Sequence, residues 1–441
     1  MSTSYPQLPR FYVRVPVKFA IAVFLSLSWL AFSLWLALPW VRELTSAVHW
    51  SFAWFAVGGI AIVPGLMNAF LLASLAMDRR PTRTLLDTYP PLTILVAAYN
   101  ESTSIVDTVH SIERQQYPGK LQVLVIDDGS TDDTAALGES LDYPWFKLLR
   151  QPKNAGKAVA LNRGLALAEH DLVVTLDGDS YLYGGALQRL VERYAADPAR
   201  TRAVAGTMLV RNSRTNWVTR MQEWDYFHGI SAIKRVQSLY QGTLVAQGAF
   251  SIYDRQTLRD LGGWDECVGE DIVLTWAILS AGWRVGHAED AICFTNAPES
   301  LRQLIRQRQR WARGMIEAFK RHPRILVAPH LSTLFVWWNL FFPWLDAAFT
   351  FCFIPGVLLA FFGIYAIAGP VTLMLLPLSL LMNAMMFHVA ARTFAHHGLK
   401  VRRNPLGFLA YAIGYSFVMQ PASVAGYLSE LFGARRSWGT K

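Results

Sequence analysis

Long apolar runs lie at both ends of the chain, whereas the middle alternates short apolar and polar stretches. Two runs, Phe19 to Val41 and Phe52 to Met77, are each long enough for a helix that crosses a bilayer, which needs about 20 residues. A cleaved signal peptide is the alternative for the first run, but that run is long and no small-residue cleavage site follows it. Basic residues before the first run and after the second predict that the next segment is cytosolic.

The middle of the chain carries a regular alternation of strand and helix patterns. Strand–helix alternation predicts an α/β domain with a mostly parallel, Rossmann-like sheet. Ligands of such sheets bind at the carboxyl ends of the strands, where the polar residues of this chain gather. The predicted strands are Leu92–Ala98, Leu121–Ile126 and Asp171–Leu176, and the predicted helices between them are Ser104–Gln116 and Thr131–Leu141.

The C-terminal apolar region is harder to divide into spans. The stretch around Asp346 predicts an interfacial or re-entrant helix up to about Trp344, followed by a span. Val371–Ala391 predicts a further span, and Pro405–Phe432 a weaker one interrupted at Gln420-Pro421. Five spans in total would put the basic tail outside, whereas four or six would keep it inside, so the number of spans stays open.

Composition supports a membrane protein and argues against two other classes. The chain has 441 residues, of which 53% are hydrophobic, above the roughly 45–50% of soluble proteins. The net charge of +9 could indicate a nucleic-acid partner, but the basic residues collect beside the apolar runs as topology signals, so no such partner is expected. Three widely separated cysteines support neither a disulfide framework nor a zinc site.

Three carboxylate motifs follow predicted strands or begin a predicted helix. Asp128 ends the second strand and either caps the next helix or binds a nucleotide base or ribose. Asp177 and Asp179 lie one residue apart after the third strand, where they form a solvated turn or hold Mg²⁺ or Mn²⁺ together with substrate phosphates. Glu270 and Asp271 either favour an acidic helix start or supply a general base.

A fourth motif lies in a strongly basic helical stretch from Arg302 to Lys320. A basic amphipathic helix on the membrane surface is one interpretation. Arginine clusters also bind pyrophosphate through bidentate, charge-assisted contacts, and Trp311 beside Arg310 offers a flat face for a sugar ring. Both roles are compatible.

These four motifs, in this order, resemble the processive family 2 glycosyltransferases, which include cellulose, hyaluronan, chitin-oligosaccharide and poly-β-1,6-N-acetylglucosamine synthases. Their signature D, DxD, D and QxxRW corresponds to Asp128, Asp177-Gly178-Asp179, Asp271 and Gln307 to Trp311. Each part is weak evidence, but the ordered set is strong and the likeness covers nearly the whole chain.

The resemblance implies a GT-A domain inserted between N- and C-terminal transmembrane helices. The implied divisions are a membrane region at 1–80 with two helices, the cytosolic catalytic domain at 90–298, the QxxRW and interfacial helices at 299–344, and a membrane region with a short tail at 345–441.

The resemblance also implies a role for individual residues. Asp271, next to Glu270, would be the general base, and Arg310 would stabilise the leaving diphosphate. Gln247 stands where relatives place a small or hydroxyl residue, and Gly269 where many have Thr. The implied nucleotide-sugar site comprises Tyr99, Glu101, Asp128, Lys157, Asp177, Asp179, Gln307, Arg310 and Trp311; the acceptor site Gln247, Gly248, Asp271 and Trp311; and the metal site Asp179 supported by Asp177.

The implied activity is inverting, metal-dependent polysaccharide elongation from a UDP-sugar in the inner (plasma) membrane, with translocation of the product and a small membrane accessory subunit as a further partner. The sequence around Gly269–Trp276 and Gln309–Gly314 favours UDP-N-acetylglucosamine, with UDP-glucose next. The ending Ser437–Lys441 resembles hyaluronan synthases and keeps hyaluronan- or chitin-type products open. The QxxRW motif argues against a non-processive lipid glycosyltransferase. The lack of a P-loop and the few polar residues in the spans argue against a nucleotide-sensing transporter. The full set of carboxylates argues against a catalytically silent scaffold.

Overall fold

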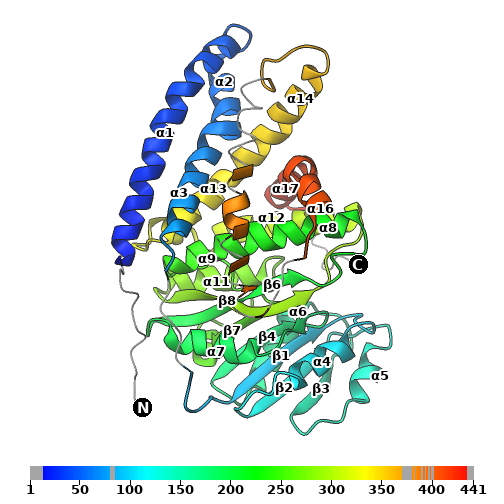
Figure 1. Cartoon of the computed structure of the whole chain (residues 1–441). Helices are drawn as coiled ribbons and strands as arrows, with labels where there is room; N and C mark the ends of the chain where they lie inside the picture. The colour runs from blue at the N-terminus through cyan, green and yellow to red at the C-terminus, as the bar shows by residue number, and fades with distance from the viewer. Residues whose placement is uncertain are drawn as a thin grey trace.

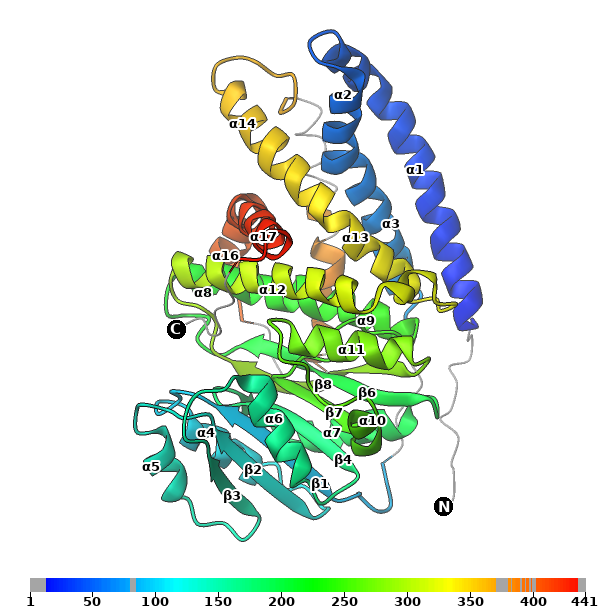
Figure 2. The ribbon, with the colours of Figure 1, turned by 180° about the vertical axis from the view of Figure 1, so that it is seen from behind.

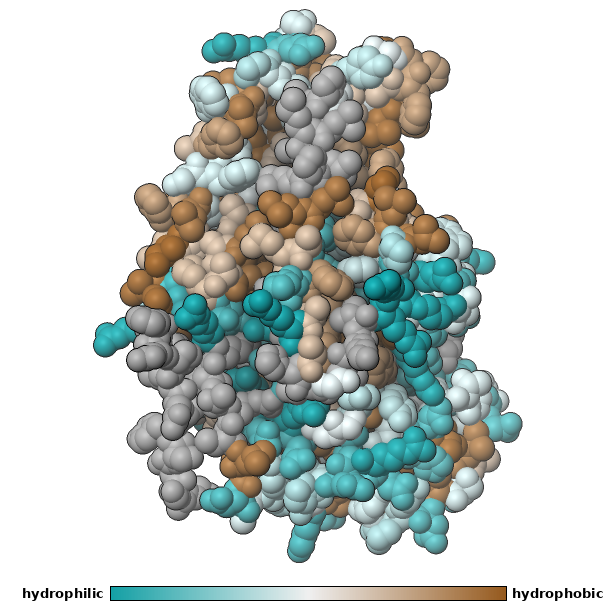
Figure 3. All heavy atoms as spheres, in the orientation of Figure 1, coloured by the Kyte–Doolittle hydropathy of each residue, from teal (hydrophilic) through white to brown (hydrophobic). Residues whose placement is uncertain are grey.

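The structure, a computed structural model, describes residues 13–79, 85–369, 380–381, 383–388, 391–392, 394–395, 398 and 402–434. A sheet covered by helices forms the lower part of the molecule, and long helices from both ends of the chain rise above it (Figure 1). Hydrophilic residues dominate the surface of the lower part, while hydrophobic residues dominate the helices above it (Figure 3).

A single mixed sheet of eight strands organises the lower part, with the order β3-β2-β1-β4-β7-β6-β8-β5. Strands β3, β2, β1 and β4 are parallel, as the strand–helix alternation predicts, and β6 is parallel to β8. Strand β7 runs antiparallel to both β4 and β6, and β5 antiparallel to β8. The strands are β1 (Leu92–Ala98), β2 (Leu121–Asp127), β3 (Phe146–Arg150), β4 (Leu172–Asp177), β5 (Tyr181–Leu182), β6 (Thr201–Val210), β7 (Phe250–Asp254) and β8 (Arg284–Thr295).

Helices cover both faces of the sheet, and the longest of them lies between the sheet and the membrane helices (Figure 2). This helix, α12 (Leu301–Arg321), starts at a capping box, in which Ser300 Oγ accepts the Gln303 N–H and Gln303 Oε1 accepts the Ser300 N–H. The other helices are α4 (Ile105–Glu113), α5 (Thr134–Glu139), α6 (Lys157–Ala166), α7 (Ala186–Ala196), α8 (Trp217–Trp224), η2 (Asp225–Ile230), α9 (Ser231–Leu239), α10 (Arg255–Asp260), α11 (Glu270–Ser280) and η3 (Pro323–Val327).

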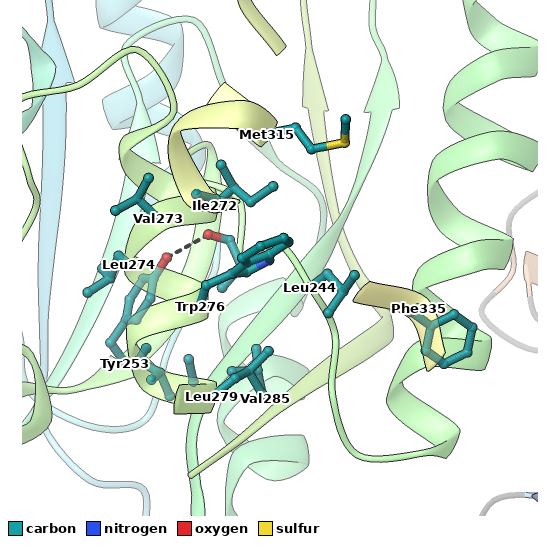
Figure 4. Packing of buried hydrophobic residues seen from close by; sticks show 14 of the residues in the cluster. Leu244, Tyr253, Ile272, Val273, Leu274, Trp276, Leu279, Val285, Met315 and Phe335 are labelled. Carbon is teal, nitrogen blue, oxygen red and sulfur yellow. Dashed lines mark hydrogen bonds between the residues drawn. The ribbon is translucent and has the colours of Figure 1, made fainter. Parts of the chain in front are cut away.

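The core beneath α11 and α12 is built around large aromatic side chains. Trp276 and Tyr253 are fully buried, and the Tyr253 hydroxyl donates a hydrogen bond of 2.7 Å to the carbonyl of Ala246 (Figure 4). The Trp276 ring meets Phe319 of α12 edge-on, with centroids 4.7 Å apart. Such edge-to-face pairs add to the burial of the rings themselves, so this contact fixes α12 over α11.

The two predicted N-terminal spans form long helices. The first is α1 (Val15–Thr45), and the second comprises α2 (Trp50–Val57), η1 (Gly58–Ile62) and α3 (Val63–Ala76) without a break. Four helices in the described part of the chain are long and apolar enough to cross a membrane, namely Val15–Thr45, Trp50–Ala76, Thr333–Ala360 and Pro405–Leu431.

The predicted break near Trp344 is wrong. The segments α13 (Thr333–Ala348), η4 (Phe349–Phe353) and α14 (Ile354–Ala360) form one continuous helix, so the boundary at 344/345 falls inside it. Asp346, whose charge motivated the break, instead accepts a hydrogen bond of 2.8 Å from the Tyr427 hydroxyl. A polar group that finds a partner within the helices does not interrupt an apolar span.

The last apolar segment comprises α16 (Pro405–Ala410), η5 (Tyr411–Tyr415) and α17 (Ser416–Leu431), and Pro421 lies inside α17 without ending it. In Figures 1 and 2 α17 is seen nearly end-on while α1 and α13 run up the page, so α17 runs across them. Most of the predicted span at Val371–Ala391 and the whole of Ser437–Lys441 lie outside the described residues.

Candidate active site

The carboxylate motifs meet at the carboxyl edge of the sheet. Ala98 at the end of β1 is in register with Asp127 on one side, and Ala97 is in register with Asp177 on the other. The N–H of Asp128 donates to the Ala98 carbonyl at 2.8 Å. The acids after β2 and β4 therefore flank the end of β1, where ligands of such sheets bind.

Asp128 is buried and holds the loop that carries Lys157. One carboxylate oxygen accepts the Ala155 N–H at 2.9 Å and the Gln151 side-chain amide at 3.0 Å, and the other accepts the Gly156 N–H at 2.8 Å. Burial raises the pKa of Asp128, and the two backbone donors oppose that shift. Asp128 thus fixes the turn before α6, and its contact with a uridine stays a prediction.

The residues after β1 form one wall of the site. Asn100 has a left-handed backbone (φ 55°), and its side-chain oxygen accepts the Thr131 N–H at 2.9 Å, which ties this loop to the turn after β2. Tyr99 and Glu101 are half-buried on either side of it, and the Glu101 carboxylate accepts the Ser104 hydroxyl at 2.8 Å. These two residues, which the family resemblance places in the nucleotide-sugar site, are therefore held beside the carboxylates.

Lys157, in the first turn of α6, joins two of the acidic motifs. Its ammonium forms an ion pair with Asp177 and lies 3.7 Å from a Glu270 carboxylate oxygen. Burial alone would lower the pKa of Lys157, but the carboxylates of Asp177 and Glu270 raise it above its usual value. Burial raises the pKa of Glu270, and Lys157 opposes that shift. The predicted acceptor loop passes close to this ammonium, because a Cβ on Gly248 would lie 2.8 Å from it.

Asp271 lies half-buried in the first turn of α11, within electrostatic range of the buried Lys234 of α9. Burial lowers the pKa of Lys234 to about 7, although the Asp271 carboxylate acts to raise it. The loop before α11 is held from α12, where one carboxylate oxygen of the buried Glu317 accepts the N–H groups of Val268 at 2.9 Å and Gly269 at 3.0 Å. The position of the candidate base therefore depends on a residue of a different helix.

The start of α11 approaches α12 more closely than any side chain permits. A Cβ on Gly269 would lie 2.4 Å from the Cα of Gly314, and a Cβ on Gly314 would lie 2.7 Å from the Cα of Gly269. This contact requires glycine at both positions.

The QxxRW residues lie on α12 at positions that share one face. Gln307 is buried against the Tyr226 hydroxyl of η2, and Trp311 keeps 40% of its surface exposed. Arg310 is half-buried, and its charge acts to lower the pKa of Glu270. The basic motif and the acidic motif of α11 thus belong to the same site.

Asp177 and Asp179 suit a divalent cation that is held largely by its substrate. Asp177 pairs with Lys157, and Asp179 accepts a hydrogen bond of 3.3 Å from the Thr295 hydroxyl. Within the residues that the structure describes, no group of three or more His, Cys, Asp or Glu side chains gathers around a common point. Mg²⁺ is often held by one or two carboxylates together with substrate phosphates, and the residues present fit that arrangement.

The Gln247 side chain is directed at the backbone of two strands of the sheet. Its side-chain amide donates to the carbonyl of Gly206 at 2.6 Å and to that of Phe250 at 3.4 Å, so it links β6 to β7. Its predicted contact with the acceptor stays a prediction.

The sequence patterns missed Tyr226, Lys234, Thr295 and Glu317. Glu317 carries a usable signal, because it is the only acidic residue between Arg302 and Lys320. The other three lie outside any recognisable motif, and only the fold brings them to the site.

The chain resembles known glycosyltransferases in sequence and in fold. Residues 90–314 match the family model described as glycosyltransferase-like family 2. The chain is 34% identical over 235 residues to a poly-β-1,6-N-acetyl-D-glucosamine synthase of Staphylococcus aureus. The matched region covers 52% of this chain and 56% of the relative. It is 33% identical over 232 residues to the synthase of the same name from Staphylococcus epidermidis, with the same coverage. The chain thus spans about half the length of the curated relatives it matches.

Among solved structures, the fold resembles that of a mannosyltransferase from Pyrobaculum calidifontis, determined in complex with GDP-Man and Mn²⁺. The TM-score is 0.60 at 20% identity, and the match covers 90% of this chain and all of that one. At this identity the likeness concerns the fold, which is the predicted GT-A fold. The family match extends over half of the chain and contains the whole site from Tyr99 to Trp311, so the chain belongs to glycosyltransferase family 2.

Proposed function

We propose that this chain is an inverting, metal-dependent and processive membrane glycosyltransferase that elongates a poly-N-acetylglucosamine from UDP-N-acetylglucosamine and passes it across the membrane. The observation that carries the proposal is the convergence of Lys157, Asp177, Glu270 and Asp271 beside Arg310 and Trp311. The similarity to two staphylococcal poly-N-acetylglucosamine synthases supports the choice of sugar.

Each residue has a task that follows from its surroundings. Tyr99 and Glu101 receive the nucleotide at the end of β1, and Asp128 holds the loop that presents Lys157. Lys157 keeps Asp177 and Glu270 together without direct repulsion. Loss of this ammonium would leave the buried carboxylate of Glu270 without its cation, which is costly, so Lys157 holds the two acids in place.

The reaction is a single displacement. Asp271 takes the proton of the acceptor hydroxyl while the hydroxyl oxygen attacks the anomeric carbon of the donor sugar. The bond between that carbon and the diphosphate breaks, and the configuration at the carbon is inverted. Arg310 neutralises charge on the departing diphosphate, which is the electrostatic stabilisation that often supplies the largest share of catalysis. A divalent cation held by Asp179, supported by Asp177, would add further stabilisation of that charge when bound.

The membrane helices provide the setting. In the proposed topology the sheet domain lies in the cytosol beneath the inner membrane, and α1, α3 and α13 cross the bilayer above it. Trp311 stacks on the terminal sugar, so that each added residue can move toward the membrane helices without release.

The test is turnover by purified protein in nanodiscs with a panel of UDP-sugars and Mg²⁺ or Mn²⁺. We expect UDP release only with UDP-N-acetylglucosamine, loss of activity with EDTA, and products of high molecular mass that are degraded by a β-1,6-N-acetylglucosaminidase. A single-sugar lipid product would reject processivity, preference for UDP-glucose would reject the sugar, and no turnover of any UDP-sugar would reject the enzyme.

A further inference from the structure

The last apolar segment, residues 405–431, holds α12 at three places along its length. Tyr415 reaches the start of the QxxRW motif. Gly426 packs so closely that a Cβ there would lie 2.5 Å from the carbonyl oxygen of Gln309. Glu430 pairs with Lys320 at 3.0 Å near the end of the helix. A change in the position of this segment would therefore move α12 with it.

The first of these places is a closed network around Arg308. The guanidinium donates to the Asp225 carboxylate at 2.6 Å and to the Tyr415 hydroxyl at 2.9 Å, and the Tyr415 hydroxyl also donates to Asp225 at 3.0 Å. The Arg308 side chain keeps only 9% of its surface exposed. Three separate elements, α12, η2 and η5, thus meet at one buried charge-assisted network.

Arg308 also stacks on the aromatic residue of the motif. Its guanidinium carbon lies 4.0 Å from the centroid of the Trp311 ring, within the range of a cation–π contact. A planar guanidinium can stack on a ring and still direct its edge donors at two partners, which an ammonium cannot do. The orientation of the partly exposed Trp311 indole is therefore fixed by the same group that joins the three elements.

We propose that Arg308 is a positioning residue for the acceptor sugar: together with Asp225 and Tyr415, it holds the Trp311 indole in its stacking orientation and so makes the acceptor site depend on the last apolar segment. This inference rests on the proposed function, because it takes a sugar as the group that Trp311 receives. A purely structural ion pair would affect donor and acceptor reactions alike, whereas a positioning role affects the acceptor alone.

The kinetic test compares Arg308→Lys and Tyr415→Phe with Arg306→Lys, which changes an exposed arginine on the same helix. UDP release without acceptor measures transfer to water, and elongation of an N-acetylglucosamine oligosaccharide measures transfer to sugar. Arg308→Lys should raise the acceptor KM roughly 5- to 30-fold, from the loss of a partly desolvated cation–π contact, with the donor KM and the hydrolysis rate within about two-fold of wild type. Tyr415→Phe should act in the same direction more weakly, and Arg306→Lys should change neither rate. A parallel fall of hydrolysis and elongation, or an unchanged acceptor KM, would overturn the proposal.

A second measurement does not depend on activity or on the identity of the donor. In protein labelled with 5-fluorotryptophan, the ¹⁹F resonance that disappears in Trp311→Phe belongs to Trp311. Arg308→Lys should shift and broaden this resonance, and Arg306→Lys should leave it unchanged. An unaltered Trp311 resonance in Arg308→Lys would overturn the proposal even if the enzyme used a different sugar, whereas a shifted resonance in an inactive protein would refute only the proposed function.

Discussion

Removal of the Glu317 carboxylate tests whether α12 sets the position of the candidate base. Glu317→Ala leaves the N–H groups of Val268 and Gly269 without their acceptor in a buried loop. An unsatisfied buried donor costs about 1–3 kcal/mol, so two of them should lower the free energy of unfolding by about 3 kcal/mol. At roughly 2–4 °C per kcal/mol for a domain of this size, the Tm should fall by about 6–12 °C. Because Asp271 follows this loop directly, kcat should also fall by at least about tenfold, the effect of a small misplacement of a catalytic group.

The assay combines thermal unfolding in detergent with donor turnover by the folded protein at a temperature well below the transition. Glu317→Gln is the conservative variant, because its amide oxygen can still accept the two N–H groups, and it should recover most of the stability and of kcat. Glu139→Ala, which removes an exposed acid paired with Arg150, is the matched control and should change stability by less than about 0.5 kcal/mol. If Glu317→Ala unfolds at the wild-type temperature, or if its folded fraction retains wild-type kcat, the reasoning is refuted.

Two further substitutions test the contact of α11 with α12 and the burial of Lys234. Gly269→Ala places a Cβ 2.4 Å from the Cα of Gly314, so overpacking should lower the free energy of unfolding by about 1–3 kcal/mol, as measured by thermal unfolding. In the control Gly184→Ala the new Cβ meets nothing within 4 Å, and the stability should not change. Equal effects of the two substitutions would contradict the close contact of α11 with α12. Burial lowers the pKa of Lys234 to about 7, so between pH 7 and 9 the unfolded state binds more protons than the folded state and stability rises with pH by up to about 1.4 kcal/mol per unit. Lys234→Met should lack this part of the rise, and an identical pH dependence in the two proteins would count against the burial of that ammonium.

Sequence patterns predicted those features that depend on local periodicity. The strand at Leu92–Ala98 is found with the predicted bounds. The strand before Asp128 ends one residue later than predicted, at Asp127, and the strand that ends at Asp177 is shifted by one residue at both ends. Their acids meet at one edge because parallel strands bring their carboxyl ends together. The antiparallel course of β7 between β4 and β6 depends on pairing between segments distant in sequence, so local patterns did not reveal it.

The missed features depend on tertiary contacts. Asp346 suggested a boundary between an interfacial helix and a span because its partner Tyr427 lies 81 positions away in the sequence. The family resemblance places Lys157 in the nucleotide-sugar site, and only the fold shows that it pairs with Asp177 and lies next to Glu270. A motif can therefore identify the participants, but their charge partners come from the assembled structure.

We propose Asp271 as the base for sugar transfer, in a site whose donor binding does not need this carboxylate. The direct measurement is the turnover of UDP-N-acetylglucosamine by Asp271→Asn and by wild type, with the donor Kd of both proteins determined by calorimetry in nanodiscs. In Asp271→Asn, kcat should fall by about 10²- to 10⁴-fold while the donor Kd changes by less than about three-fold, because general-base catalysis contributes on that order. Turnover close to that of wild type, or a loss of donor binding as large as the loss of turnover, would contradict the assignment of Asp271 as the general base.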